Sequence, residues 1–293
     1  MERILIDGLS FAIPLFVMAI GGIYSEKSGV TNLALEGLQG MGAFIGAFVA
    51  VLAAGYFGSN SQVPYYLAIV CAMAGGMLYS LLYGLLCIRL KANQIIGGVV
   101  INILAMSLTA FFTKLLNRLV FGAASEKFVL GVSARLTIPL LSGIPVIGAA
   151  FKDVYPFEIL ILLIAVVAWY VLYKTRYGMN LRACGDNPHA VDAAGENVTR
   201  NFSSNIYVGY GYLAIAAMIF GNWKILPTLG SCLLFGFARS GGYYLVQKMQ
   251  MPSSYSDLAM TLPYIVTMLL LIFFSKYNRA PRALGEIYDK GKR

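Results

Sequence analysis

Residues 33–57 read LALEGLQGMGAFIGAFVAVLAAGYF, an apolar run whose one charged residue is Glu36. About 20 helical residues span the hydrocarbon core of a bilayer, so this run is long enough to cross it. We expect a helix here, because open strands leave their backbone groups unpaired in lipid.

The composition extends this prediction to the whole chain. Of its 293 residues, 59% are hydrophobic and 12% are charged, and the mean hydropathy is +0.73. This is more apolar surface than one soluble core hides, so the natural solvent is a lipid bilayer. Seven further apolar segments are Gly8–Tyr24, Pro64–Ile88, Ile95–Leu116, Pro156–Tyr173, Tyr207–Gly221, Ile225–Ala238 and Leu258–Ser275.

We therefore predict a single transmembrane domain over residues 1–293, an all-α polytopic bundle with about 8 membrane segments. The two segments that flank Asn222–Lys224 are short, so some segments are expected to be broken or re-entrant. The first apolar run begins within a few residues of Met1 and is followed by no small-residue cleavage motif, so we expect it to be retained.

The net charge of +9 comes from basic residues spread through short loops. This placement fits the positive-inside rule and not a nucleic-acid patch. The basic tail, residues 276–293, is then cytoplasmic, and the uncharged turn Gly58–Gln62 is external. Residues 174–201 return to the cytoplasm. The stretch Asn117–Tyr155 is external, and we expect its Pro- and Gly-interrupted middle, Ile138–Ala150, to be a surface or re-entrant element.

The number of crossings presents a difficulty. Between the cytoplasmic segment at Lys174 and the cytoplasmic tail the crossings must be even, yet three apolar segments lie there. Either one of them re-enters or a helix is missing. At the N-terminal end, a half-crossing between Ser25 and Gly42 would resolve a similar conflict.

Polar residues inside the apolar segments are the candidates for a substrate pathway. Asn32 and Glu36 have a helical spacing of four, which predicts one shared face. An ionisable membrane residue is costly unless it faces a polar cavity or a partner, so Glu36 is the first candidate; the alternative is a pair with Lys27. Gln94 and Asn102 can present amides to a polar cargo or join helices to each other. Asn93 is suited to cap the helix that follows it.

The most polar part of the chain is the segment 174–201, which contains RACGDNPHAVDAAGENV at 182–198. Asp186 or Asn187 can cap a short helix, Pro188 suits its first turn, and Gly195 suits its end. Such a bounded cytoplasmic helix is well built to dock on another protein, although a solvated connecting loop is the alternative.

The sequence lacks the residues and motifs that several kinds of chemistry require. Cys71, Cys87, Cys184 and Cys232 form no CxxC pair and are expected to be free thiols, and His189 is the only histidine, so no histidine-based metal site is predicted. The chain contains no GxxxxGK[ST], GxSxG or HExxH. We therefore predict no enzyme and no cofactor in this chain, and any ATP with its Mg²⁺ must bind a partner.

Five blocks of sequence together resemble a known family. They are YSEKSGVTNLALEGLQGMGAF (24–44), KANQIIGG (91–98), YKTRYGMNLRACGDNPHAVDAAGENV (173–198), GYLAIAAMIFGNW (211–223) and LPYIVTMLLLIFF (262–274). The chain resembles, from about Gly8 to Leu284, the permeases of nucleoside and simple-sugar ABC importers, which are related to ribose and branched-chain amino-acid permeases.

This resemblance implies a multi-pass permease of the cytoplasmic (inner) membrane. It implies three protein partners: an ATP-binding cassette ATPase, a second permease that is identical or homologous, and a substrate-binding lipoprotein. It also implies that Asn32, Glu36, Gln94 and Asn102 line the pathway. The ATPase-coupling helix would contain Gly185, Asp186, Asn187, Pro188, His189, Asp192, Ala193 and Gly195.

The sequence departs from the family at one place. Family members carry a further membrane helix and an external turn after the counterpart of Gly195–Val198, whereas here the next block begins at Gly211. This is the crossing that the count found missing. Nucleoside is the expected cargo and a simple sugar the alternative. The alternative functions of other classes are a passive channel, an ion-coupled transporter and a membrane-embedded enzyme.

Overall fold

Every regular element in the described part of the chain is a helix. The structure is a computed structural model, and it describes residues 2–58, 61–122, 125–128, 156–187, 211–252, 255, 261–274 and 279–286. Within these residues the regular elements are helices, which confirms the predicted all-α class. They are α1 (Glu2–Lys27), α2 (Leu35–Phe57), α3 (Val63–Gly84), the π-helical turn η1 (Leu85–Arg89), α4 (Gln94–Phe121), α6 (Pro156–Lys174), α7 (Arg176–Asp186), α9 (Gly211–Phe220), α10 (Ile225–Lys248) and α12 (Leu262–Phe274).

Five of the described helices are long and apolar enough to cross a membrane. They are Ile4–Lys27, Leu35–Phe57, Val63–Arg89, Gln94–Phe121 and Phe157–Lys174. At a rise of about 1.5 Å per residue each covers a bilayer core of about 30 Å, apart from small differences that tilt or bilayer thinning absorbs. These five helices confirm five of the predicted apolar segments, and the protein is a multi-pass membrane protein.

Of the two predicted segments around Asn222, the first is described only from Gly211, as the 10 residues of α9. The second, α10, has 24 residues and continues ten residues beyond the expected end at Ala238. Arg239 does not end the helix, because its guanidinium lies over the ring of Phe11, 4.3 Å from the ring centroid. The described part of the last segment is α12, with 13 residues. α4 runs to Phe121, and the apolar stretch Ile138–Ala150 lies outside the described residues.

The chain divides into two compact units. The first contains α1 up to Ile23, α6, α10 and α12, together with α9 from Leu213. In this unit α1 and α10 approach at two glycines: a Cβ on Gly236 would overlap the carbonyl oxygen of Gly8, and a Cβ on Gly8 would lie 2.6 Å from the Phe237 ring. Small residues at a crossing allow the backbones of membrane helices to come close together.

Two side-chain hydrogen bonds add to the packing of the first unit. The hydroxyl of Ser240 donates to the carbonyl oxygen of Ile4 at 3.0 Å, and the hydroxyl of Ser10 donates to the carboxylate of Glu158 at 3.1 Å. Glu158 is buried in the first turn of α6, where a helix N-terminus favours negative charge. These bonds connect α1 to α10 on one side and to α6 on another.

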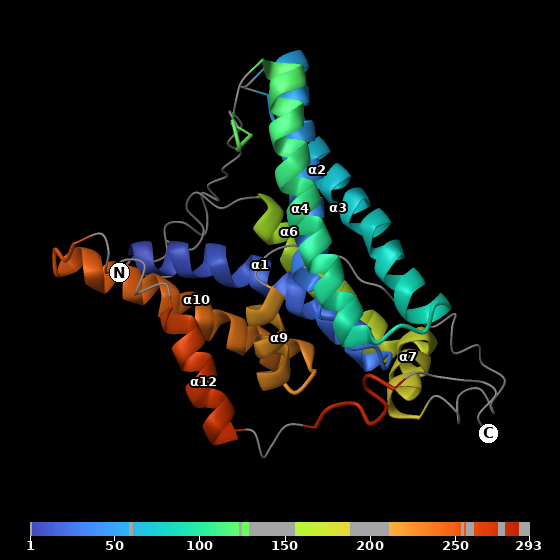
Figure 1. The fold of residues 1–293 in the computed structure, drawn as a ribbon. Coiled ribbons are helices and arrows are strands. Elements are labelled where there is room, and N and C mark those ends of the chain that lie inside the picture. The colour runs from blue at the N-terminus through green and yellow to red at the C-terminus, as the bar shows by residue number, and fades with distance from the viewer. Residues whose placement is uncertain are drawn as a thin grey trace. The chain divides into compact units, whose positions relative to one another are not determined.

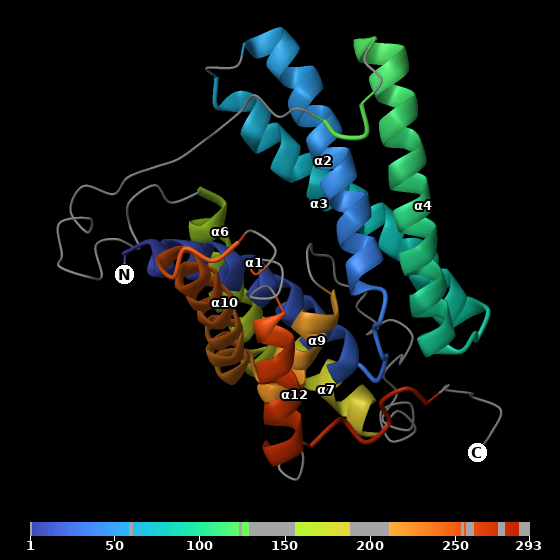
Figure 2. The ribbon, with the colours of Figure 1, turned by 60° about the vertical axis from the view of Figure 1, so that its left-hand side comes forward.

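The second unit contains α2, α3, η1, α4, α7 and the segment Pro281–Glu286. In Figures 1 and 2, α2 runs beside both α3 and α4. Gly46 and Gly75 permit the close packing of α2 on α3, since a Cβ at either position would overlap Ala72 or Ile45. Where the three helices converge, a buried cluster forms from Val30, Ala34, Leu38, Tyr83, Cys87 and Ile101.

The crossing of α1 and α10 gives a matched pair of glycine substitutions. Gly236→Ala should destabilise the folded chain by about 1–3 kcal/mol, the usual cost of overpacking, because its Cβ has no room beside Gly8. Gly230→Ala, on the same helix and with open space around its Cβ, should be neutral or slightly stabilising. Thermal unfolding of both purified variants in detergent measures the difference, and equal melting temperatures would contradict the predicted contact.

Candidate functional site

A break in helical structure between α1 and α2 organises the candidate site. α1 ends at Lys27 and α2 begins at Leu35, so residues 28–34 lack the helical hydrogen bonds of their neighbours. A turn starts the break: the N–H groups of Ser28 and Gly29 donate to the carbonyl oxygens of Ser25 and Glu26, at 3.1 and 3.0 Å. Gly29 has a φ of 95°, a conformation that favours glycine. Most of the break is buried, so its remaining backbone groups need other partners.

Two amide side chains of α4 supply these partners. The Oε1 atom of Gln94 accepts a hydrogen bond from the N–H of Thr31 at 2.8 Å. Asn102 bonds the chain on both sides of the start of α2: its Oδ1 accepts from the N–H of Gly37, and its Nδ2 donates to the carbonyl oxygen of Leu33, both at 2.7 Å. Gln94 and Asn102 therefore hold the break against α4.

Tyr83 completes the junction from α3. Its hydroxyl donates to the carbonyl oxygen of Thr31 at 2.6 Å and lies 3.2 Å from the carbonyl oxygen of Gln94. Asn93 caps α4 as the sequence predicts, because its Oδ1 accepts from the N–H groups of Ile95 and Ile96 at 2.9 and 3.2 Å. The break is thus bonded to side chains from two neighbouring helices.

Asn32 and Glu36 do not share the helical face that their spacing predicts. Asn32 lies in the break before α2, where it is buried and its Oδ1 accepts from the N–H of Ala34 at 3.0 Å. Glu36 lies in the first turn of α2, and its side chain is exposed. The prediction of a shared face is wrong because the helix begins only at Leu35.

A cavity of about 640 Å³ opens beside this junction, between α2 and α4. It contains two of the four predicted pathway residues, Glu36 and Asn102, whereas Asn32 and Gln94 are not in its lining. Its polar lining consists of Glu36, Gln39, Asn102, Thr109 and Tyr212, and its larger apolar residues are Val99, Ile103 and Met106.

Glycine makes room at one edge of this cavity. A Cβ on Gly211 would lie 2.8 Å from the backbone nitrogen of Glu36, and one on Gly37 would lie 2.8 Å from the Cα of Asn102. Backbone therefore packs directly on backbone beneath the lining. Glu36 projects from a tightly packed helix start and not from a loose loop, which fixes the backbone from which its side chain extends.

Three polar lining residues were missed by sequence reasoning. Gln39 lies three residues after Glu36, and Thr109 lies seven residues after Asn102, so helical periodicity places each on the same face as a predicted residue. That signal was available in the sequence. Tyr212 is separated from the other lining residues by about a hundred positions, and no local spacing connects it to them.

The predicted docking segment is described only at its beginning. α7 ends at Asp186, so Gly185 and Asp186 close that helix, and the N–H of Asn187 donates to the carbonyl oxygen of Ala183 at 2.8 Å. Arg182–Asp186 therefore belong to α7, which precedes the predicted helix, and the stretch from Pro188 to Gly195 that was expected to form that helix is not described. Pro188, His189, Asp192, Ala193 and Gly195 lie outside the described residues.

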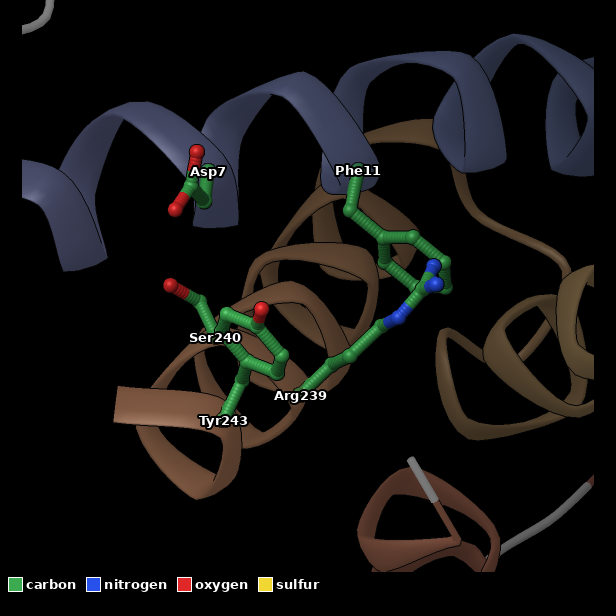
Figure 3. Close-up of a pocket in the computed structure, with 5 residues that line it drawn as sticks. All are labelled: Asp7, Phe11, Arg239, Ser240 and Tyr243. Atoms are coloured by element: carbon green, nitrogen blue, oxygen red, sulfur yellow. The ribbon is translucent and has the colours of Figure 1, made fainter. Parts of the chain in front are cut away.

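The first unit has a separate, charged cavity of about 250 Å³ between α1 and α10 (Figure 3). Its lining consists of Asp7 and Phe11 from α1 and of Arg239, Ser240 and Tyr243 from α10. Arg239 stacks on Phe11, and a cation over an aromatic face stabilises a charge that is away from bulk water. We assign these contacts to the packing of the two helices.

The chain belongs to the family described as the branched-chain amino acid transport system / permease component, which matches residues 4–202. It is 36% identical over 317 residues to the guanosine ABC transporter permease protein NupQ of Bacillus subtilis, covering 97% of this chain and 96% of that protein. It is 33% identical over 323 residues to the nucleoside ABC transporter permease protein NupC of Lactococcus lactis, covering 100% of this chain and 98% of that protein.

A sugar permease is also similar, at greater distance. The putative glucose ABC transporter permease protein TsgC13 of Haloferax volcanii is 29% identical over 252 residues, covering 76% of this chain and 71% of that protein. No solved structure gives a significant match to the chain. The class of protein is therefore an ABC transporter permease component.

The alignment to NupC reveals a difference in length. It extends over 323 positions and takes in the whole of this 293-residue chain, so 323 less 293, or about 30 positions, have no residue here. A membrane helix of about 20 residues with its turn has this size. The family match ends at residue 202, close to the place where the sequence predicts a missing crossing.

Loss of the Asn102 amide should weaken the junction between α2 and α4. Asn102→Ala leaves the N–H of Gly37 and the carbonyl oxygen of Leu33 without these partners, and each unsatisfied buried group costs about 1–3 kcal/mol. Thermal unfolding in detergent should show a clear fall in melting temperature. Ser107→Ala, at an exposed position on the same helix, is the matched control and should change little. Equal stability of the two variants would argue against the bridging role.

Proposed function

We propose that this chain is the membrane permease subunit of an ATP-driven importer and that its cargo is a nucleoside. The observation that carries the proposal is the similarity over nearly the full chain to NupQ and NupC, whose names specify guanosine and nucleoside. The sugar alternative rests on a relative that is less similar and covers less of the chain.

The chemistry of the cavity between α2 and α4 supports a nucleoside over a sugar. Its volume of about 640 Å³ falls in the range of small-molecule sites, roughly 300–1,000 Å³. A nucleoside has one flat, weakly polar part and one part rich in hydroxyls. The apolar side chains of Ile103 and Met106, with the ring of Tyr212, suit the faces of a base.

Polar groups of the same cavity suit the ribose and the edge of the base. The carboxylate of Glu36 is an acceptor for ribose hydroxyls, and the amide of Gln39 offers both donors and acceptors. Asn102 is already bonded to the backbone of α2, so its contribution is to hold the wall of the cavity in place. We propose that Asn32 and Gln94 act in the same way from behind the wall.

Energy for transport must come from another subunit, because the chain contains no phosphate-binding GxxxxGK[ST] motif. We propose that an ATP-binding cassette ATPase, holding ATP and Mg²⁺, docks on the segment 174–201. The described part of that segment exposes Tyr177 and Met179 on α7 and also Asp186 and Asn187. A second permease and a substrate-binding lipoprotein would complete the complex in the cytoplasmic membrane, with the basic tail of this chain in the cytoplasm.

Uptake into proteoliposomes that contain the whole complex tests this proposal. Labelled guanosine should accumulate only when hydrolysable ATP is present on the ATPase side, and labelled glucose should not accumulate. Uptake of guanosine without ATP would favour the passive channel or ion-coupled transporter and would overturn the proposed mechanism. ATP-dependent uptake of glucose and not of guanosine would contradict the proposed cargo but would agree with the proposed mechanism.

The carboxylate of Glu36 should matter for cargo binding. Glu36→Gln keeps the size and polarity of the side chain but removes a charge-assisted acceptor, and hydrogen bonds to charged groups contribute about 1.5–3 kcal/mol. We expect the KM for guanosine uptake to rise about tenfold or more.

Glu126→Gln is the matched control for this substitution. Glu126 is exposed and lies outside the cavity, and the hydrogen bond from Lys114, at 2.7 Å, holds the pKa of its carboxyl below the ordinary value. Exposed ion pairs of this kind contribute little to stability, so the fold should be unchanged. The KM should stay as in the wild type, because Glu126 does not line the cavity. An unchanged KM in Glu36→Gln would remove Glu36 from the pathway.

A further inference from the structure

The segment Pro281–Glu286, which we call the C-terminal clasp, is folded against the second unit. Its turn is closed by a hydrogen bond of 3.2 Å from the N–H of Leu284 to the carbonyl oxygen of Pro281. A second bond of 3.2 Å runs from the N–H of Glu286 to the carbonyl oxygen of Ala283. Pro281 and Ala283 are buried, so the clasp packs on the protein.

Two backbone hydrogen bonds connect the clasp to two distant parts of the chain. The N–H of Ala283 donates to the carbonyl oxygen of Gly185 at 2.9 Å, at the end of α7. The N–H of Gly285 donates to the carbonyl oxygen of Gly29 at 3.0 Å, in the break between α1 and α2. The clasp therefore bridges these two places through its main chain.

Glycine at all three contact points permits this arrangement. Gly29 and Gly285 have φ values of 95° and 82°, which other residues rarely adopt. A Cβ on Gly185 would overlap the carbonyl oxygen of Lys27 and lie 3.1 Å from the nitrogen of Gly29. Three backbone segments thus meet with no side chain between them, a contact that leaves little freedom for one segment to move without the others.

The two bridged places belong to the proposed ATPase-docking segment and to the break that is bonded to the cavity wall. Gly185 lies in the segment 174–201, which we propose to dock on the ATPase. Gly29 lies in the break whose backbone is bonded to Gln94 and Asn102, and Asn102 lines the cavity. Hydrogen bonds and the short stretches of backbone between them therefore connect the docking segment through the clasp to the cavity wall.

We propose that the C-terminal clasp is a coupling element, which passes movement of the ATPase-docking stretch to the start of α2. This inference rests on the proposed function. The clasp positions the cavity wall and does not touch cargo, so its loss should separate ATP hydrolysis from uptake. A segment that merely finished the chain would have no such effect.

Substitution by proline tests the clasp with a matched control. Ala283→Pro removes the N–H that bonds Gly185, and proline is disfavoured at this third position of the turn Pro281–Leu284. Arg282→Pro places the same residue at the second position, which favours proline, and leaves the N–H of Ala283 in place. Each variant is assembled with its ATPase, second permease and binding protein in proteoliposomes.

The readouts are ATP hydrolysis, guanosine uptake and co-purification of the ATPase. For Ala283→Pro we expect normal assembly, hydrolysis within about twofold of the wild type and uptake at least tenfold lower. Arg282→Pro should keep uptake within about twofold. Equal uptake by the two variants would overturn the coupling role. Loss of ATPase co-purification with Ala283→Pro would overturn it too, since the clasp would then serve assembly.

Amide hydrogen exchange separates failure of the clasp from failure of the proposed function. In the wild-type complex, peptides that cover residues 29–31 and 281–286 should be protected, and Ala283→Pro should speed their exchange at least tenfold. Protection with no ATP-dependent uptake by the wild type would overturn the proposed function, and the coupling role with it. Rapid exchange of these peptides in a wild-type complex that transports guanosine would overturn the clasp alone.

Discussion

The described site depends on one constraint: the backbone groups between α1 and α2 have no helical partners and need others. A helix that stops at a buried position leaves N–H and carbonyl groups that water does not reach. The chain satisfies them from α3 and α4, through Tyr83, Gln94 and Asn102. The same bonds fix where α2 begins, and hence where Glu36 projects.

This constraint divides the four predicted pathway residues into two roles. Asn32 and Gln94 are buried and bonded to the backbone, so their polar groups are occupied by the fold. Glu36 faces the cavity with its side chain exposed. Asn102 has both roles, because it lines the cavity and also bonds the backbone of Gly37 and Leu33. In our account the bonded amides give the wall its shape, and Glu36, Gln39 and Tyr212 contact the cargo.

The sequence predicts those features that depend on local chemistry. Long apolar runs predict the five spanning helices, and Asn93 before an apolar run predicts a helix cap. Features that depend on tertiary contact were not predictable. Arg239 is accommodated within α10 by the ring of Phe11, and the stretch that contains Asn32 stays outside the helix, bonded to Gln94 through the N–H of Thr31. Tyr212 and the clasp reach their sites only through the fold. The count of apolar segments in the sequence indicated one missing membrane crossing, and a crossing with its turn is about as long as the length difference from NupC.

Protection of introduced thiols by cargo tests the central claim, that the cavity between α2 and α4 carries nucleoside. With Cys71, the one partly exposed native cysteine among four, replaced by Ser, Gln39→Cys in the assembled complex should react with a small polar thiol reagent. Guanosine should slow this labelling at least tenfold and should leave labelling of Glu126→Cys, which is exposed beyond the end of α4 and outside the cavity lining, unchanged. Equal labelling of Gln39→Cys with and without guanosine, in a complex that still imports guanosine, would contradict the account.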